Sequence, residues 1–318
     1  MTRWWVELWS RTEHPRSLAA VRIALSSVLL VDLLRIRQLG LVRTLMGSHA
    51  AGGLGVPENL DHVPWIVRWL GTGDVMHESL WWGMTIGCVM LLLGVLPRVS
   101  ALGLALLSAQ FAIILPAADR GIDMLIRNAL VVLAFAQSAE TWSVTSVMRH
   151  KSFTAPESTR VQAWPRYLLA LQLVILYFAA GVSKAASSWT PFGGASALFI
   201  AMSDPHFQRL PDAWLRMGFR LTQVGTLVTW VWEWIAPAVL LAWWYRETPD
   251  RPGRLRAWMN RYPTVELYFV VGAIFHVGTH LFLRLGIFPF AVMSLYPAAV
   301  HPDRIQSGWR WLTSRWRT

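Results

Sequence analysis

Lys184 is the residue whose type and position most directly indicate chemistry. It follows the apolar run of residues 177–183 (YFAAGVS), and Trp189 lies five residues further along the chain. A lysine at the edge of an apolar pocket can lose its proton near neutral pH and act as a base. A lysine that only extends its ammonium group from the end of a membrane helix into water has the same sequence setting. The segment therefore predicts either a base or an interfacial lysine, and the second is the default from these residues alone.

Glu233 lies in a Trp-rich segment, residues 229–234 (TWVWEW), in the middle of an apolar run. An ionised side chain at the centre of a membrane helix costs about 2.5 to 3.5 kcal/mol on insertion scales unless it is paired or hydrated. No residue within four positions can neutralise this carboxylate. We expect Glu233 either to pair with an arginine such as Arg22 or Arg127, or to take part in chemistry.

His276 and His280 are four residues apart and therefore share one face of a predicted helix. This spacing occurs in metal sites. The glutamate of the HExxH motif is absent, and no third ligand is evident, so we predict no metal. The pattern is better explained by two histidines inside a helix bundle, hydrogen-bonded to other helices, and both are also candidates for the lining of a pocket.

Arg22 and Asp32 lie in one apolar run, ten residues apart. This separation is about 15 Å along a helix, so the two side chains cannot pair directly. Asp32 and Arg35 are three residues apart and are expected to pair at the helix end. Arg22 lies deeper, and we expect it either to contact other helices in the bundle or to have a functional role.

Arg127 belongs to a charged cluster at the start of another apolar run. Asp123 lies four residues before it, at a distance that allows an ion pair on one helix. A carboxylate near a helix N-terminus also suits the helix dipole. The cluster is expected to be either a structural network or the rim of an outward-facing site.

The composition is typical of an integral membrane protein. Of the 318 residues, 54% are apolar and 15% are charged, against about 25% charged in soluble domains, and the mean hydropathy is +0.40. Many of the 20 Trp residues stand at the ends of apolar runs, as they do at membrane interfaces. The net charge of +11 is spread over the loops rather than along one stripe, which argues against nucleic-acid binding. The single cysteine, Cys88, excludes an internal disulfide.

The apolar runs predict an all-α integral membrane protein, a polytopic bundle of about eight transmembrane helices with no sizeable soluble domain. We divide the chain into an N-terminal cytoplasmic segment (residues 1–16), a transmembrane domain (17–300) and a basic cytoplasmic tail (301–318). The last two helices could instead form a re-entrant pair. The expected helices cover residues 17–36, 79–96, 99–116, 122–139, 166–182, 223–245, 264–284 and 285–300, and we expect long loops at 38–78, 140–165, 183–222 and 246–263.

The distribution of arginines predicts the orientation. With eight helices and a cytoplasmic N-terminus, the most basic segments fall on the cytoplasmic side, as the positive-inside rule requires. These segments are the N-terminus, the turn at Arg98, residues 140–165 and 246–263, and the tail. We therefore expect a multi-pass protein of the cell (inner) membrane with both termini cytoplasmic and Lys184 near the outer leaflet.

The segment around Lys184 resembles a signature of the vitamin K-dependent gamma-carboxylase superfamily, whose bacterial members are called HTTM (horizontally transferred transmembrane domain) proteins. The resemblance extends loosely over most of the chain, from about Pro15 to Pro297. Its specific part is the stretch from Gly181 to Trp189. The other matching features are Arg22 in an apolar helix, the segment 94–98 (GVLPR), Glu233 before Pro237, the pair His276 and His280, and Phe288.

In the carboxylase, the lysine at this position is held to be the base that deprotonates reduced vitamin K. The resemblance therefore implies that Lys184 is a base and that the cofactor is a reduced quinone. The carboxylase carries a second lysine where this chain has Ser183. It also has a large luminal portion that binds its protein substrate, whereas about twenty residues follow the last predicted helix here. We therefore do not expect carboxylation of a docked protein.

Three functions are compatible with these observations. The first is a membrane enzyme acting on a quinone or another lipid-soluble substrate, with Lys184 as base and with Glu233, His276 and His280 lining the pocket. Arg22, Trp189 and Arg127 are then candidates for holding the cofactor. The second is a non-catalytic accessory, maturation or immunity factor for a secreted peptide, whose partner the sequence does not identify. The third, a transporter, is disfavoured because no internal repeat is evident.

Overall fold

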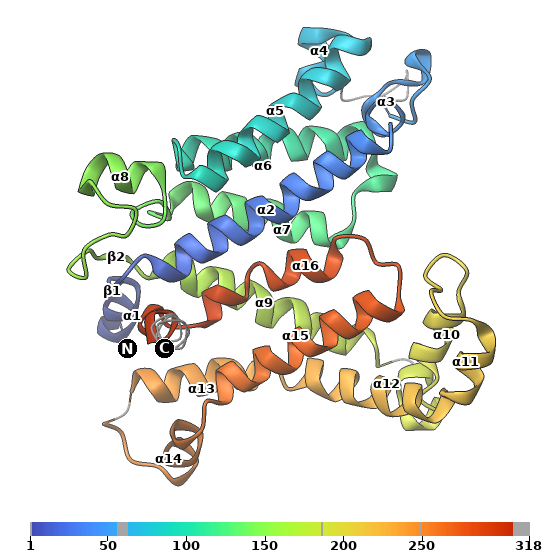
Figure 1. Ribbon diagram of the computed structural model, residues 1–318. Helices are drawn as coiled ribbons and strands as arrows, with labels where there is room; N and C mark the ends of the chain where they lie inside the picture. The colour runs from blue at the N-terminus through green and yellow to red at the C-terminus, as the bar shows by residue number, and fades with distance from the viewer. Residues whose placement is uncertain (1, 56–62, 186, 249, 308–318) are drawn as a thin grey trace, which may run out of the picture. The chain divides into compact units, whose positions relative to one another are not determined.

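The computed structural model describes residues 2–55, 63–185, 187–248 and 250–307. It is 73% helical, and its one small sheet pairs β1 (Thr12–Glu13) with β2 (Val161–Gln162) in antiparallel register. The all-α fold class is therefore confirmed (Figure 1). The chain divides into two compact units, the first comprising Met1–Leu169 with Val300–Thr318 and the second comprising Ala170–Ala299.

Several helices have the length and composition needed to cross a membrane. In the described part of the chain, five do so as single helices, and α12 with α13 forms a sixth segment bent by 47°. These helices are α2 (Arg16–Gln38), α5 (Asp74–Leu93), α6 (Pro97–Ile114), α9 (Trp164–Ser183), α15 (Thr264–Phe282), α12 (Phe219–Trp234) and α13 (Pro237–Glu247). The chain is thus a polytopic membrane protein.

The predicted number of eight crossings stays a prediction, because two of the expected helices are short. The fourth corresponds to α7 (Gly121–Phe135), whose 15 residues extend about 22 Å, less than the roughly 30 Å of hydrocarbon. The eighth corresponds to α16 (Phe288–Met293) followed by the 3₁₀ turn η5 (Tyr296–Ala299).

In the first unit, α2, α5, α6 and α7 lie side by side (Figure 1). Gly94 ends α5 in the left-handed conformation, with φ of 69°, and Pro97 begins α6 at its first position. A left-handed glycine after one helix and a proline at the start of the next are the residues that such a tight turn favours. The remaining elements of this unit are α1 (Thr2–Trp9), α3 (Val42–Met46), η1 (His49–Ala51), α4 (Trp65–Leu70), η2 (Pro116–Ala118) and α8 (Val144–His150).

In the second unit, the predicted sixth helix, residues 223–245, is not continuous. It breaks into α12 and α13 immediately before Pro237, because proline lacks the N–H of the helical hydrogen bond and its ring clashes with the preceding turn. The other elements of this unit are the C-terminal part of α9, η3 (Ser187–Trp189), η4 (Pro191–Gly193), α10 (Ala197–Ser203), α11 (Asp212–Met217), α14 (Arg254–Arg261), α15, α16 and η5.

The segments expected to be loops contain short helices, so the prediction of plain loops there is wrong. Helices α3 and α4 lie in 38–78, α8 in 140–165, α10 and α11 in 183–222, and α14 in 246–263. Each has eight residues or fewer, too short for a search for membrane-length apolar runs to detect. The predicted tail, 301–318, lies outside the described residues from position 308 onward.

The helices expose apolar side chains on their outer faces, as expected of a protein solvated by lipid. Helix α5 shows this most clearly. Its exposed stripe recurs at the spacing of one helix face and consists of Trp82, Ile86, Val89 and Leu93. Its opposite face packs inside the first unit through Leu80, Trp81, Met84, Cys88 and Leu91.

Candidate functional site

Lys184 and Glu233 form an ion pair in the second unit. Lys184 stands just past the end of α9, and its Nζ contacts Oε1 of Glu233 on α12. The glutamate side chain is 4% exposed and the lysine side chain is 24% exposed. The pair therefore joins a carboxylate packed inside the unit to an ammonium group that reaches the surface.

Gly181 brings the two helices of this pair together. A Cβ atom at this position would lie 3.0 Å from the backbone nitrogen of Trp234 and 3.1 Å from Cβ of Glu233, closer than side chains normally approach. Only glycine allows α9 to pass α12 at this distance. The glycine one turn before Lys184 thus sets the geometry of the ion pair.

Trp189 completes the surroundings of Lys184. The Nζ atom of Lys184 lies 4.9 Å from the centre of the Trp189 ring, within the range of a cation–π interaction. This ring attracts the charged form of the lysine, as does the Glu233 carboxylate. The tryptophan that the sequence analysis assigned to cofactor binding therefore contacts the lysine itself.

A hydrogen-bonded group of two tyrosines and a histidine lies in the same unit. The Tyr177 hydroxyl lies 2.9 Å from Nε2 of His276 and 2.5 Å from the Tyr296 hydroxyl, and all three side chains are buried. This contact fulfils the expectation of a buried histidine bonded across helices.

Aromatic rings pack against this group. Trp232, the residue before Glu233, lies 4.4 Å from Tyr177 between ring centres and stacks on Tyr268 at 5.0 Å. The Trp232 indole N–H donates to the backbone oxygen of Tyr268 over 3.2 Å. Aromatic rings of α12 and α15 therefore pack beside the hydrogen-bonded group of Tyr177, His276 and Tyr296.

Several buried polar atoms near these rings have no hydrogen-bond partner among the described residues. An unsatisfied buried group costs about 1 to 3 kcal/mol, so such atoms point to a missing ligand or water. They are Oε2 of Glu233, the hydroxyl of Tyr268, Nε1 of Trp230, and Nδ1 of both His276 and His280. Within the described part of the chain, no group of three or more His, Cys, Asp or Glu residues is arranged to hold a metal ion.

The structure brings together only some of the predicted site residues. Lys184 contacts both Glu233 and Trp189, and His276 belongs to the tyrosine group of the same unit. His280 lies one turn further along α15 and packs against Phe290, with ring centres 4.6 Å apart. Arg22 and Arg127, expected as possible partners of Glu233, belong to the first unit, and the expectation of an arginine partner is wrong.

Arg22 holds backbone carbonyl groups. Its guanidinium is fully buried and donates to the oxygens of Leu91 and Leu92, both at 2.7 Å, at the C-terminal end of α5. It also donates to the oxygens of Ser138 (3.2 Å) and Trp142 (2.6 Å). The last carbonyls of a helix lack partners within the helix and carry partial negative charge. Arg22 therefore has a structural role here.

Arg127 pairs with Asp119, through contacts of 2.7 and 2.8 Å, and the expected pair with Asp123 does not form. Asp123 instead accepts from Arg120, at 2.9 Å from both the side-chain Nε and the backbone N, and so caps α7. The cluster around Arg127 is thus a structural network at the start of α7.

The pair of Asp32 with Arg35 that the sequence predicted at the end of α2 is not formed among the described residues.

Two features of the site were missed from the sequence. Tyr177, Tyr268 and Tyr296 were not singled out, because a tyrosine in an apolar run gives no local signal. The second feature was readable: only two of the 29 Lys and Arg residues are lysines, Lys151 and Lys184. A guanidinium cannot be deprotonated in a protein, whereas a lysine can lose its proton, so the rarity of lysine in this chain was a reason to compare the surroundings of these two positions.

Residues 10–202 match the family model of the HTTM domain. The matched region includes Lys184 and Trp189 and ends before Glu233 and His276. No curated protein and no solved structure matches the chain.

Proposed function

We propose that this chain, which belongs to the HTTM domain family, is a membrane-embedded enzyme in which Lys184 removes a proton from a lipid-soluble hydroxyl compound, a reduced quinone. The observation that carries the proposal is the ion pair of Lys184 with Glu233, a buried carboxylate whose second oxygen has no partner among the described residues. Such a pair holds a lysine next to a group that can take its proton.

The chemistry follows from the pair. Transfer of one proton from the Lys184 ammonium to the Glu233 carboxylate gives a neutral amine and a carboxylic acid, with no net change of charge. A low-dielectric setting favours this neutral form relative to water, because separated charges lose their hydration there. The free amine then accepts the proton of a substrate hydroxyl and becomes ammonium again, leaving the substrate as an oxyanion.

The residues around the pair fit a reduced quinone. When bound, this group supplies an acidic phenolic hydroxyl and reducing equivalents. The rings of Trp232 and Tyr177, which pack on each other, make this region aromatic, as a site for a ring compound would be. The unpartnered atoms of Tyr268 and His276 offer hydrogen bonds to oxygens of the ligand. Lys184 and Trp189 remain partly accessible, which suits entry from the lipid.

We further propose that the protein resides in the cell inner membrane with both termini in the cytoplasm. The basic segments 140–165 and 246–263 support this orientation. Lys184 then stands at the outer leaflet, where a lipid-soluble substrate can reach it by diffusion in the bilayer.

The test is a direct measurement of proton abstraction. The protein is reconstituted in lipid nanodiscs without oxygen, and a naphthohydroquinone is added. Binding is followed by quenching of tryptophan fluorescence, and deprotonation is followed by the red-shifted absorbance of the naphthohydroquinone anion. Wild-type protein should quench and show the anion, whereas Lys184→Met should quench but show no anion. Lys151→Met, at an exposed position, is the matched control and should behave as wild type.

Two outcomes would contradict the proposal. An unchanged anion signal in Lys184→Met would remove Lys184 from the mechanism. If the wild type showed neither fluorescence quenching nor the anion, a reduced quinone would be excluded as the substrate. The non-catalytic accessory role would then be the better proposal for the function.

A further inference from the structure

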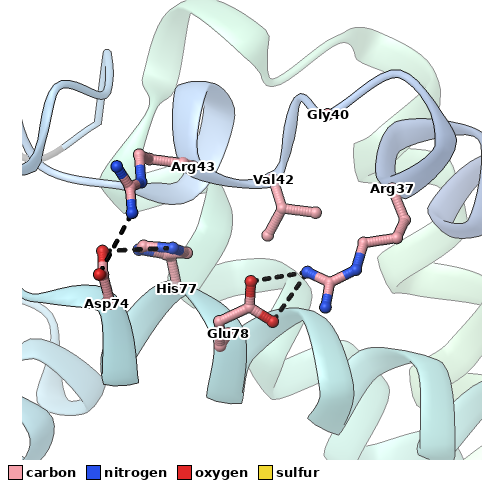
Figure 2. Close-up of a pocket in the computed structure, with 7 residues that line it drawn as sticks. All are labelled: Arg37, Gly40, Val42, Arg43, Asp74, His77 and Glu78. Atoms are coloured by element: carbon pink, nitrogen blue, oxygen red, sulfur yellow. Dashed lines mark hydrogen bonds and ion pairs between the residues drawn. The ribbon is translucent and has the colours of Figure 1, made fainter.

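A second site lies in the first unit, at the C-terminal end of α2 and the N-terminal end of α5. A cavity of about 360 Å³ opens there, within the range of small-ligand sites. Figure 2 shows Arg37 and Arg43 on one wall, and Asp74, His77 and Glu78 on α5 opposite them. Two cations thus face two carboxylates across the cavity, and the formal charges balance.

The two ion pairs across the cavity differ in strength. Nη1 of Arg37 donates to both carboxylate oxygens of Glu78, at distances of 2.6 and 2.8 Å. Arg43 reaches Asp74 through one contact of 3.2 Å, and both of these side chains are more than half exposed. A single long contact between exposed partners contributes little. Arg43 and Asp74 can therefore separate to bind a ligand that carries both charges.

His77 points to the same conclusion independently. Its side chain is almost completely buried, at 3% exposed, and it lines the cavity. Nδ1 has no hydrogen-bond partner among the described residues, and Nε2 lies 3.8 Å from Asp74, beyond hydrogen-bond distance. A buried ring nitrogen without a partner indicates a ligand or water in the cavity.

The position of the cavity selects the kind of ligand. It lies where two membrane-length helices end, the level at which lipid headgroups are found. Trp81, about two turns into α5, donates its indole N–H to the oxygen of Leu33 and lies beneath the Arg37 guanidinium at 4.6 Å. Beside them, Leu34 and Trp82 expose apolar surface. A ligand with a charged head and acyl chains fits this arrangement better than a soluble ion.

We propose that this cavity binds the headgroup of a phospholipid that carries a phosphodiester and a primary ammonium group, as phosphatidylethanolamine does. Arg43 and Nδ1–H of His77 donate to the phosphate, and Asp74 accepts from the ammonium. Arg37 and Glu78 remain paired and hold the two walls together. The acyl chains lie against the exposed apolar face of α2 and α5.

The proposal is tested by native mass spectrometry of delipidated protein titrated with single lipids. Phosphatidylethanolamine should bind most tightly. Phosphatidylcholine, whose ammonium has no N–H, and phosphatidylglycerol, which has no ammonium, should each bind about tenfold more weakly, the loss expected for one charge-assisted hydrogen bond. A titration with soluble phosphoethanolamine, which lacks acyl chains, tests whether the ligand is a lipid or a free metabolite.

Two substitutions address the site itself. Arg43→Gln should weaken phosphatidylethanolamine binding about tenfold or more. Gly40→Asn should block the cavity, because Gly40 lines it with φ of 68°, which asparagine tolerates, and no atom lies within 4 Å of a Cβ placed there. Arg216→Gln, an exposed arginine on α11, is the matched control and should leave binding unchanged.

Three results would overturn the proposal. The first is equal binding of phosphatidylcholine and phosphatidylethanolamine. The second is wild-type binding by both Arg43→Gln and Gly40→Asn. The third is binding of soluble phosphoethanolamine as tight as that of the lipid, which would assign the cavity to a metabolite. All variants are checked for a monodisperse peak in gel filtration.

Discussion

Arg22 and Lys184 are both cations placed among apolar helices, yet their surroundings differ. Arg22 is fully buried, and its donors are directed at four backbone oxygens. Lys184 is partly exposed and contacts one carboxylate and one aromatic ring. The partners of Arg22 cannot change their charge, whereas the partner of Lys184 can accept a proton.

Under the proposed function, this difference separates a structural cation from a reactive one. A guanidinium bonded to helix-end carbonyls stabilises a fixed arrangement of helices and has no proton to give. An amine beside a carboxylate with a free oxygen has two protonation states of equal net charge. The first unit thus uses a fully buried cation for packing, whereas the proposed function assigns chemistry to the partly exposed cation of the second unit. The following predictions test this division, starting with the largest effect.

Replacement of Arg22 should have the largest effect on stability. Arg22→Leu removes the guanidinium donor from four carbonyl oxygens, of which that of Leu91 still accepts from the backbone N–H of Gly94. We expect the free energy of unfolding to fall by about 3 to 5 kcal/mol, since each unsatisfied buried group costs about 1 to 3 kcal/mol and the loop partly relaxes. Denaturant unfolding in detergent measures this loss. If Arg22→Leu were as stable as the wild type, water would be replacing the guanidinium. Arg22 would then not be a structural cation, in contradiction to the contrast drawn with Lys184.

Lys184→Arg separates the two roles of a cation at the second site. The arginine keeps the positive charge and can still pair with Glu233, so the melting temperature should change little. It cannot be deprotonated, so formation of the naphthohydroquinone anion should fall at least about 100-fold, the usual contribution of a general base. Full activity in Lys184→Arg together with loss of stability in Lys184→Met would assign the lysine a structural role like that of Arg22.

Alanine substitutions at two glycines, Gly94 beside Arg22 and Gly181 beside Glu233, test the close packing around each cation. A Cβ at Gly94 would lie 2.8 Å from Nη1 of Arg22, and the φ of 69° adds strain. We expect Gly94→Ala to lower stability by about 2 kcal/mol. Gly181→Ala should lower it by about 1 to 3 kcal/mol and also reduce turnover, because it displaces Glu233.

Gly278 on α15 provides the matched control for both substitutions. No atom lies within 4 Å of a Cβ placed there, so Gly278→Ala should be neutral or stabilise the helix by up to about 1 kcal/mol. The measurements are thermal unfolding and the anion assay. Loss of turnover in Gly94→Ala at a temperature where it stays folded would contradict the separation of packing and chemistry.

The smallest effect concerns His14, a buried group of the first unit outside the membrane helices. Burial, with the nearby positive charge of Arg16, lowers the pKa of this histidine below its ordinary value. The unfolded chain therefore binds a proton at higher pH than the folded protein does. Stability should hold above about pH 6.5, the ordinary histidine value, and fall as the pH decreases below it.

The measurement is the melting temperature at pH 7.5 and pH 5.5. His14→Gln should show a smaller decrease on acidification than the wild type, while its anion formation at pH 7.5 stays at the wild-type level. Equal decreases in both proteins would show that His14 does not contribute to the acid sensitivity.

Hydropathy alone identified most of the long helices of this protein. The runs at 17–36, 79–96, 99–116, 166–182 and 264–284 each correspond to one long helix, because an apolar run of this length has few alternatives in lipid. It did not identify the break at Pro237, where the residue was visible but its consequence depends on the neighbouring helices. Nor did it identify short helices such as α10 and α14, which have eight residues or fewer and so form no membrane-length apolar run.

The contacts of the candidate site also differ in whether the sequence alone could predict them. Lys184 and Trp189 are five residues apart, so their contact could be expected from local sequence. The contact with Glu233 joins positions 49 residues apart, and that of Tyr177 with Tyr296 joins positions 119 residues apart. From the sequence, Glu233 was expected to pair with Arg22 or Arg127, and Lys184 was not identified as its partner.

The sequence by itself determined that this chain is a helical membrane protein and that Lys184 stands at the end of a helix, because transfer free energies and helix geometry act along short stretches of chain. Only the tertiary structure decided which cation the buried carboxylate meets and that Arg22 binds carbonyl oxygens instead. These partners are chosen by packing between distant segments, and small residues such as Gly181 and Gly94 determine how closely the segments approach.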